Sequence, residues 1–195
     1  YRLSPEHKFP CHLEDTVSVF DWVIKNTEKF GMDSEYIFGV GDSAGGHILA
    51  LFCAMCTNQE LADRYEFKTP KGFVPKAVAL NCALLDMEVA KEGMAGTTMQ
   101  LMKDVMPKKR MEEYLKLANP IAYVTEKFPP CFLMTANEDF LKEQPDTFMK
   151  KLEECKVPYV YKYYGDEEHK LEHVFHLDVR NEIGKICNDE QCAFF

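Results

Sequence analysis

A serine flanked by glycines has the setting of a nucleophile in this 195-residue chain. Residues 41–45 read Gly-Asp-Ser-Ala-Gly, and Gly46 follows. This pattern fits the Gly-x-Ser-x-Gly turn, which holds a serine hydroxyl out between a strand and a helix. The serine of such a turn is pushed toward positive φ, so side chains two residues before and after it would collide with the strand and helix. The pattern predicts that Ser43 is a nucleophile, and an ordinary glycine-rich turn is the alternative.

The residues on either side of the turn favour the first interpretation. Residues 36–40 read Tyr-Ile-Phe-Gly-Val, which is typical of a buried parallel strand because β-branched and aromatic side chains dominate. Residues 48–56 are apolar on all sides, which predicts a helix in the middle of a domain. We therefore expect Ser43 between a strand and a buried helix.

The rest of the chain alternates expected helices with expected strands. The first expected helix has apolar residues at the spacing of one helix face, and Gly31 should end it. These apolar residues are Leu13, Val17, Phe20 and Ile24. Further strands are expected at residues 76–82, 130–136 and 158–164, and further helices at about 145–155 and around 183–187. This alternation predicts one α/β domain over residues 1–195, with a mostly parallel sheet flanked by helices.

A stretch at about residues 86–118 departs from this alternation, because it has a helical pattern and no strand partner. Its methionines are Met87, Met94, Met99, Met102, Met106 and Met111. Methionine is flexible and polarizable, so a cap-like insertion of this kind can line an adaptable apolar pocket. An ordinary surface excursion with some core contacts is the alternative.

The composition is that of a folded protein and argues against nucleic acid as a partner. Hydrophobic residues make up 46% of the chain and charged residues 28%, which are ordinary globular values. The net charge of −9 disfavours binding to phosphate backbones, which requires a basic face. No apolar run approaches the ~20 residues that a membrane span needs. We expect a cytoplasmic protein without a membrane span.

The eight cysteines are expected to be reduced. Most lie in apolar segments, as Cys82 and Cys131 do, which suits small buried hydrophobic side chains of a cytosolic protein. Cys53 and Cys56 have C-x-x-C spacing, but they fall inside an expected helix and no second pair has metal-site spacing. We therefore expect neither a metal nor a cofactor.

Four short segments match the motifs of one known family in the same order. Residues 1–10 read Tyr-Arg-Leu-Ser-Pro-Glu-His-Lys-Phe-Pro, close to that family's Tyr-Arg-Leu-Ala-Pro-Glu-His-x-Phe-Pro, and residues 41–46 match its Gly-Asp-Ser-Ala-Gly-Gly throughout. Residues 139–143 resemble its Asp-x-Leu-x-Asp turn, with Glu143 for the second aspartate. Residues 173–175 resemble its His-Gly-Phe, with valine for glycine. The chain thus resembles the hormone-sensitive-lipase-like family of α/β-hydrolases, which are bacterial and animal carboxylesterases.

The resemblance implies a catalytic triad in the chain order Ser43, Asp139, His173. In this interpretation Ser43 attacks the substrate, His173 takes its proton and later gives it to the leaving alcohol, and Asp139 holds the imidazole in the correct tautomer. Asp139 directly follows an expected strand, and His173 lies in the loop after the next one. Both are therefore expected beside the serine at the carboxyl ends of the strands.

Neighbouring residues are alternatives for two of these roles. Those for the acid are Glu138 and Glu143, and those for the base are His169 and His176. Phe175, which follows His173 as in the family, favours His173. The remaining histidines, which we expect to be structural, are His7, His12 and His47.

The resemblance covers the whole chain but only the later part of the family's domain. The backbone N–H of Ala44 is expected to be one oxyanion donor. Its partner donors should come from a His-Gly-Gly loop that members carry upstream of residues 1–10, and residues 45–47 cannot replace that loop because they follow the serine. The chain is therefore expected to be a truncated member with an open sheet edge. We expect it either to associate through this edge, as a homo-oligomer or with a partner, or to be only marginally stable.

The expected function is hydrolysis of small-molecule, short-chain acyl esters through an acyl-enzyme intermediate. A non-catalytic binding protein of the same fold, or an inactive fragment without the upstream loop, is the alternative. The presence of Ser43, Asp139 and His173 favours the enzyme, whereas the absence of the upstream loop favours the alternatives.

Overall fold

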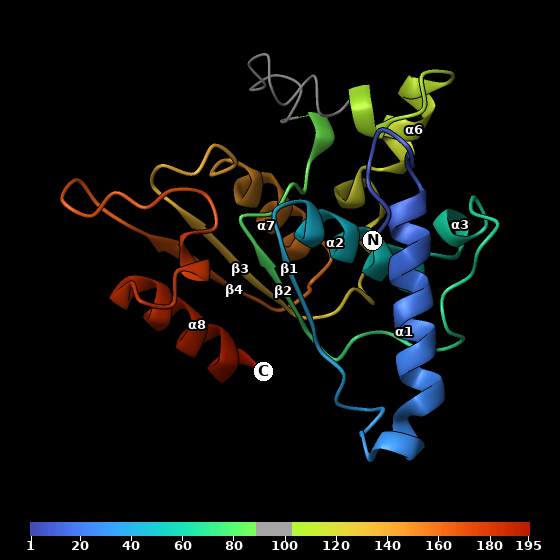
Figure 1. The fold of residues 1–195 in the computed structure, drawn as a ribbon, viewed down its shortest axis with the longest axis horizontal. Coiled ribbons are helices and arrows are strands. Elements are labelled where there is room, and N and C mark those ends of the chain that lie inside the picture. Colours follow the sequence, from blue (N-terminus) through green and yellow to red (C-terminus); the bar gives the residue numbers. More distant parts are fainter. Residues whose placement is uncertain (89–102) are drawn as a thin grey trace.

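A four-stranded parallel sheet organises the protein. The computed structural model describes residues 1–88 and 103–195 (Figure 1). The strands are β1 (Gly39–Asp42), β2 (Val78–Asn81), β3 (Cys131–Ala136) and β4 (Tyr159–Tyr164). The helices are α1 (Cys11–Phe30), α2 (Ala44–Thr57), α3 (Gln59–Ala62), α6 (Met111–Leu117), α7 (Gln144–Glu154) and α8 (Glu182–Phe194), with 3-10 turns η1 (Pro120–Tyr123) and η2 (Phe175–Leu177). The predicted α/β fold with a parallel sheet between helices is confirmed.

The strand order determines where a site can form. The strands lie in the order β1-β2-β3-β4, and each is parallel to its neighbour. Gly41 pairs with Leu80, and Asp42 pairs with Asn81. All strands therefore point their carboxyl ends to one edge of the sheet, where the residues that follow them meet.

The helix after Ser43 is buried, as its apolar sequence predicts. Every residue of α2 from Gly46 to Met55 is buried, and one side of the helix packs against β1 and β2. On its other side, Phe20 of α1 stacks on Phe52 with ring centroids 4.3 Å apart. Complete burial of a side chain of this size contributes about 1.5–3 kcal/mol, so α2 is firmly held and its first residue is fixed in space.

The opposite face of the sheet is covered only in part. Phe132 and Met134 of β3 pack with Cys187 of α8 in a second apolar cluster. Val40 of β1 is 54% exposed, and β1 is an edge strand within the described residues.

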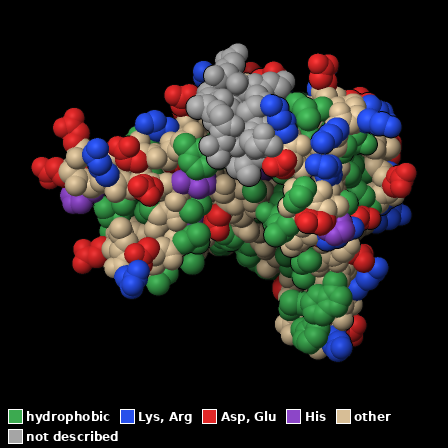
Figure 2. All heavy atoms as spheres, turned by 45° about the horizontal axis from the view of Figure 1, so that its top comes forward, with side chains coloured by type: hydrophobic (Ala, Val, Ile, Leu, Met, Phe, Trp, Pro, Cys, Tyr) green, Lys and Arg blue, Asp and Glu red, His purple; other side chains and the backbone are tan. Residues whose placement is uncertain are grey.

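Figure 2 shows hydrophobic side chains gathered at the lower end of the molecule, where α1 ends and Phe30 is exposed.

The first strand begins later than its sequence predicts. We expected residues 36–40, but β1 spans Gly39–Asp42 and Tyr36 is 59% exposed. The parallel pairing of Gly41 and Asp42 with β2 outweighs the weak strand preference of glycine and aspartate. Helix α1 does end where predicted, because Gly31 adopts a left-handed conformation with φ of 64°.

The methionine-rich stretch is described only in part. Met94, Met99 and Met102 lie outside the described residues, so the predicted cap-like insertion stays a prediction. Of the described methionines, Met87 and Met106 are buried in the main core cluster, and Met111 of α6 packs against it.

Candidate active site

The turn that carries Ser43 has the strained geometry that its glycines predict. Ser43 has φ of 54°, a conformation that side chains other than glycine rarely adopt. A Cβ on Gly41 would lie 2.5 Å from the Gly45 carbonyl oxygen, so the turn requires glycine there. The expectation for Gly45 is wrong, because a Cβ at that position would meet no atom within 4 Å. The second steric requirement belongs to Gly46, where a Cβ would lie 2.5 Å from the Ala83 Cβ.

The three residues of the predicted triad meet at the carboxyl ends of the strands. Nε2 of His173 lies 2.8 Å from the Ser43 Oγ, and Nδ1 of His173 lies 2.7 Å from Asp139 Oδ1. A carboxylate only accepts, so Nδ1 carries the proton and Nε2 accepts from the serine hydroxyl. A hydroxyl, an imidazole and a carboxylate therefore form one hydrogen-bonded chain, which is the arrangement that an activated serine nucleophile requires.

Backbone pairing brings the acid and the base together. Glu138 and Glu172 form an isolated parallel bridge beyond the ends of β3 and β4, with the Glu138 N–H donating to the Leu171 carbonyl at 3.1 Å. The residues that follow them are Asp139 and His173, which the bridge places side by side.

Asp139 is a buried carboxylate with a full set of donors. It is 1% exposed; Oδ1 also accepts from the Leu141 N–H at 2.9 Å, and Oδ2 accepts from the Thr135 hydroxyl at 2.8 Å. Burial alone would raise the pKa of Asp139, but hydrogen bonds, above all from His173, outweigh it and hold that pKa below its ordinary value. The Asp139 carboxylate is therefore charged at neutral pH.

The alternative acids and bases form other contacts or lie on the surface. Exposed Glu138 forms an ion pair with Lys170 at 3.7 Å, and Glu143 directly precedes α7 on the surface. His169 pairs with Asp166 at 3.0 Å in an exposed loop. His176 is buried beneath the serine turn, where its Nε2 lies 2.9 Å from Asp42 Oδ1.

Two residues near Asp139 were not predicted from the sequence. Thr135 is the single hydroxyl residue of β3, and its position four residues before Asp139 is a signal that could have identified it. Cys82 follows β2 with φ of 45°, and its Sγ accepts from the Val174 N–H at 3.4 Å. It also approaches Asp139, which only its place in the fold could reveal.

Cys82, Asp139 and His173 are the one group of potential metal ligands that meet within the described residues, with ligand atoms within 4.8 Å of one another. A metal ligand must be deprotonated, whereas burial raises the pKa of the Cys82 thiol. The short hydrogen bond between Asp139 and His173 also occupies the space between two of the three ligand atoms. This chemistry fits a hydrogen-bonded acid and base rather than a resident metal.

Ala44 begins α2 directly after the nucleophile. The first N–H groups of a helix have no partner within the helix, and the helix dipole favours negative charge at this end. The side chain of Ser43, the N-cap residue, does not cap the helix and instead contacts His173. The role of the Ala44 N–H as an oxyanion donor stays a prediction, which its place at the start of α2 favours.

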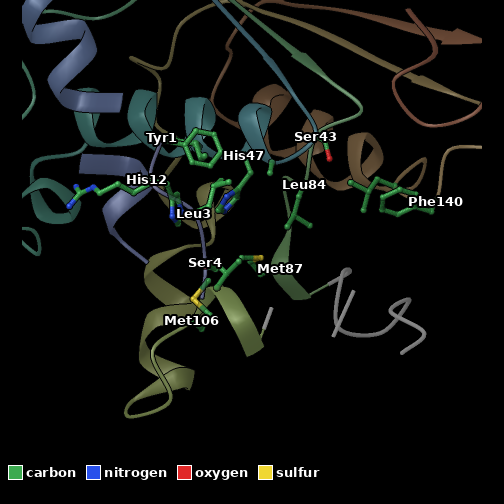
Figure 3. A pocket seen from close by; sticks show the side chains of 15 residues that line it. Tyr1, Leu3, Ser4, His12, Ser43, His47, Leu84, Met87, Met106 and Phe140 are labelled. Atoms are coloured by element: carbon green, nitrogen blue, oxygen red, sulfur yellow. The ribbon is translucent and has the colours of Figure 1, made fainter. Parts of the chain in front are cut away.

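A pocket of about 360 Å³ opens at Ser43 and Ala44. Its walls are mostly apolar and include Leu84, Met87 and Met106. Figure 3 shows Ser43 and Phe140 at one end of the pocket, and Tyr1 and His12 at the other. Phe140 also packs on the imidazole of His173, with ring centroids 4.3 Å apart, so one wall of the pocket contacts the residue that is hydrogen-bonded to Ser43.

Comparison with known proteins agrees with this architecture. Residues 1–173 match the family model described as alpha/beta hydrolase fold. Esterase LipC of Mycobacterium tuberculosis is 28% identical over 159 residues, which cover 78% of this chain and 38% of that protein. An arylesterase of Saccharolobus solfataricus is 28% identical over 163 residues, 81% of this chain and 51% of that protein.

A solved structure of esterase B from Lactobacillus rhamnosis has the same fold. It superposes with a TM-score of 0.85 at 21% sequence identity and covers 100% of this chain and 62% of that one. This chain spans about half or less of the length of the two curated relatives, LipC and the arylesterase. No helix in the described parts of the chain is long and apolar enough to cross a membrane. With the family model matched over residues 1–173 and the four motifs in their order, this chain belongs to the hormone-sensitive-lipase-like members of the α/β-hydrolase fold family.

Proposed function

We propose that this chain carries the catalytic residues of a carboxylic-ester hydrolase. The observation that carries the proposal is the continuous hydrogen-bonded chain from Ser43 Oγ through His173 to Asp139, with separations of 2.8 and 2.7 Å. Ser43 is the nucleophile, His173 the general base and acid, and Asp139 the residue that orients and stabilises the imidazole. The names of the two relatives, an esterase and an arylesterase, support the same reaction class.

The first half of the reaction forms an acyl-enzyme. The Ser43 hydroxyl gives its proton to Nε2 of His173 as Oγ bonds to the ester carbonyl carbon, and the carbonyl oxygen becomes an oxyanion that the Ala44 N–H stabilises. The bond from this carbon to the alcohol oxygen then breaks. His173 returns the proton to that oxygen, and the alcohol leaves.

The second half releases the acid. Water gives a proton to Nε2 of His173 and its oxygen attacks the acyl carbon, which regenerates an oxyanion at the Ala44 N–H. The bond to Ser43 Oγ breaks, Oγ takes the proton back, and the carboxylic acid leaves. Oxyanion holes use more than one donor, and removal of one costs about 10²–10³ in rate, so full activity needs donors besides Ala44.

The pocket supports short-chain, uncharged acyl esters as substrates. Its volume of about 360 Å³ is at the lower end of the ~300–1,000 Å³ typical of small-molecule sites. Leu84, Met87 and Met106 give it apolar walls, which favour an uncharged acyl group.

Two further proposals concern the cellular location of the protein and its association with other chains. The eight free cysteines support a reducing, cytoplasmic location. The edge strand β1, with Val40 exposed, supports association through this edge, either with a second copy or with another chain.

Hydrolysis of p-nitrophenyl acetate and butyrate tests the proposed reaction. Ser43→Ala should lower kcat/KM by about 10⁴-fold or more, because the nucleophile is lost. Ser18→Ala is the matched control, since that hydroxyl bonds the Glu14 carbonyl on the exposed side of α1. A phosphonate ester should label Ser43, as mass spectrometry of the peptides would show. Equal hydrolysis by the wild type and Ser43→Ala would refute the proposal, and ligand binding without turnover would favour a binding protein.

A further inference from the structure

Two histidines lie in the apolar pocket at a distance from the reacting groups. His12 of α1 is 8% exposed and His47 of α2 is 6% exposed, and both line the pocket that opens at Ser43. Figure 3 shows the two imidazoles together at the end of the pocket near Leu3, away from Ser43. Most of the pocket wall is apolar, and buried polar side chains such as these two imidazoles normally have a hydrogen-bonding partner.

The orientation of His47 is fixed by its backbone partner. Its Nε2 lies 2.6 Å from the carbonyl oxygen of Ala118. A carbonyl only accepts, so Nε2 carries the proton. Burial lowers the pKa of His47, so the ring is neutral and Nδ1 has a free lone pair. His47 therefore offers the pocket a hydrogen-bond acceptor.

His12 offers both a donor and an acceptor. Burial, with a smaller contribution from His47, lowers the pKa of His12 to about 4, so the ring is neutral at pH 7. The imidazole of His12 packs against the ring of Phe9, with centroids 5.4 Å apart, and neither of its nitrogens makes a hydrogen bond to a residue in the described parts of the chain. A neutral imidazole has one N–H and one lone pair, and both remain available to a ligand.

The charges around this end of the pocket exclude an anionic ligand. The guanidinium of Arg2, which also lines the pocket, already binds Asp15, with Nε 2.9 Å from Oδ1, and contacts Glu14. Both histidines are neutral, so neither can compensate a carboxylate. The matching ligand group is an uncharged one that donates and accepts, as a hydroxyl does.

We propose that His12 and His47 form a polar subsite that binds a hydroxyl group at the far end of the ester substrate. This inference rests on the proposed function and narrows its substrate class to esters that carry a hydroxyl beyond an apolar segment. His47 lies four residues, one helical turn or about 6 Å of axial rise, after Ser43 along α2. The apolar segment would lie along Leu84 and Met87, between the reacting carbonyl and the subsite.

Paired esters that differ only in a terminal hydroxyl or methyl group test the subsite. The first pair, p-nitrophenyl ω-hydroxyhexanoate and p-nitrophenyl heptanoate, places this group on the acyl side. The second pair, ω-hydroxyhexyl acetate and heptyl acetate, places it on the alcohol side. An apolar pocket disfavours an added hydroxyl by up to about 10²-fold. The wild type should instead hydrolyse the hydroxy ester of one pair with kcat/KM equal to or above that of its methyl partner.

Three variants identify the source of this preference. His12→Leu should lower the ratio of hydroxy to methyl kcat/KM about tenfold, because one hydrogen bond is lost. His12→Asn, which keeps a donor and an acceptor, should retain the ratio within about threefold. Met87→Leu, the matched control, changes the apolar wall without touching a polar group and should affect both esters of a pair alike. A ratio that His12→Leu leaves unchanged in both pairs would overturn the subsite.

Failure of the subsite and failure of the proposed function give different results. Hydrolysis of all four esters without a hydroxyl preference refutes the subsite alone. If the wild type hydrolyses none of them, the proposed function fails, and the subsite is tested by equilibrium binding of ω-hydroxyhexanamide and heptanamide to Ser43→Ala. Tighter binding of the hydroxy amide, lost on adding His12→Leu, would support the subsite, and equal binding of both amides would overturn it.

Discussion

Nε2 of His176 lies 2.9 Å from Oδ1 of Asp42, so a buried histidine that follows His173 by three residues holds the residue directly before Ser43. The same oxygen accepts from Nδ2 of Asn81 at 2.9 Å. Among the described residues, the buried Nδ1 of His176 and Oδ1 of Asn81 have no hydrogen-bond partner. The contact between His176 and Asp42 joins the end of β1 to the turn η2. It thereby connects the two loops that carry Ser43 and His173.

The first prediction concerns this connection. His176→Leu should lower kcat about tenfold with KM changed less than about twofold, because loss of the donor to Asp42 lets the Ser43 and His173 loops move apart. His176→Gln should restore most of kcat, because its amide can still donate. Urea unfolding of both variants measures stability separately. A fall in kcat that simply follows the fall in stability would assign His176 a structural role only.

The second prediction concerns Val174, which follows His173 and has φ of 55°. A β-branched residue in this left-handed conformation is strained by roughly 1–2 kcal/mol, which glycine avoids. Val174→Gly should therefore unfold with a free energy about 1 kcal/mol above that of Val174→Ala. The comparison is matched because both variants lose the valine side chain. Chemical denaturation measures it, and an alanine variant as stable as the glycine variant would show that no strain exists there.

Local sequence pattern predicts most elements of this fold because most of them bury a large share of their apolar residues. Helix α2 is apolar on all sides and is buried, and β2, β3 and β4 each lie within an apolar or aromatic run. The error at β1 arises because pairing with β2, which no local pattern contains, extends the strand through Gly41 and Asp42.

The candidate site is predictable in its chemistry but not in its supporting contacts. The order of Ser43, Asp139 and His173 predicts that they meet, and they lie in hydrogen-bonding reach, while their catalytic roles stay predictions. The contact between Asp42 and His176 joins residues 134 positions apart, so only the assembled sheet reveals it. His12 and His47 read as structural histidines in the sequence, and only the fold shows that they line a pocket.

The third prediction concerns acid stability. The folded-state pKa of Asp139 lies below its ordinary value of 3.8, so this group stabilises the protein above that pH and the contribution is lost as pH falls through the folded-state pKa. The free energy of unfolding should therefore fall as the pH is lowered below about 4. In Asp139→Asn this fall should be shallower. Urea unfolding over a pH series measures both slopes, and equal slopes would contradict a lowered pKa at Asp139.

The last prediction compares three glycines of the serine turn. A Cβ at Gly41 would lie 2.5 Å from a backbone oxygen, and one at Gly46 would lie 2.5 Å from the Ala83 Cβ, whereas one at Gly45 would meet nothing within 4 Å. Gly41→Ala and Gly46→Ala should each lower the free energy of unfolding by about 1–3 kcal/mol, because the backbone must shift to relieve the overlap. Gly45→Ala should leave stability unchanged or raise it by up to about 1 kcal/mol, because alanine is favoured over glycine in a helix and Gly45 lies in α2. Chemical denaturation of the three variants measures this order. A Gly45→Ala protein as unstable as the other two would mean that the turn requires glycine at all three positions, contrary to the space found at Gly45.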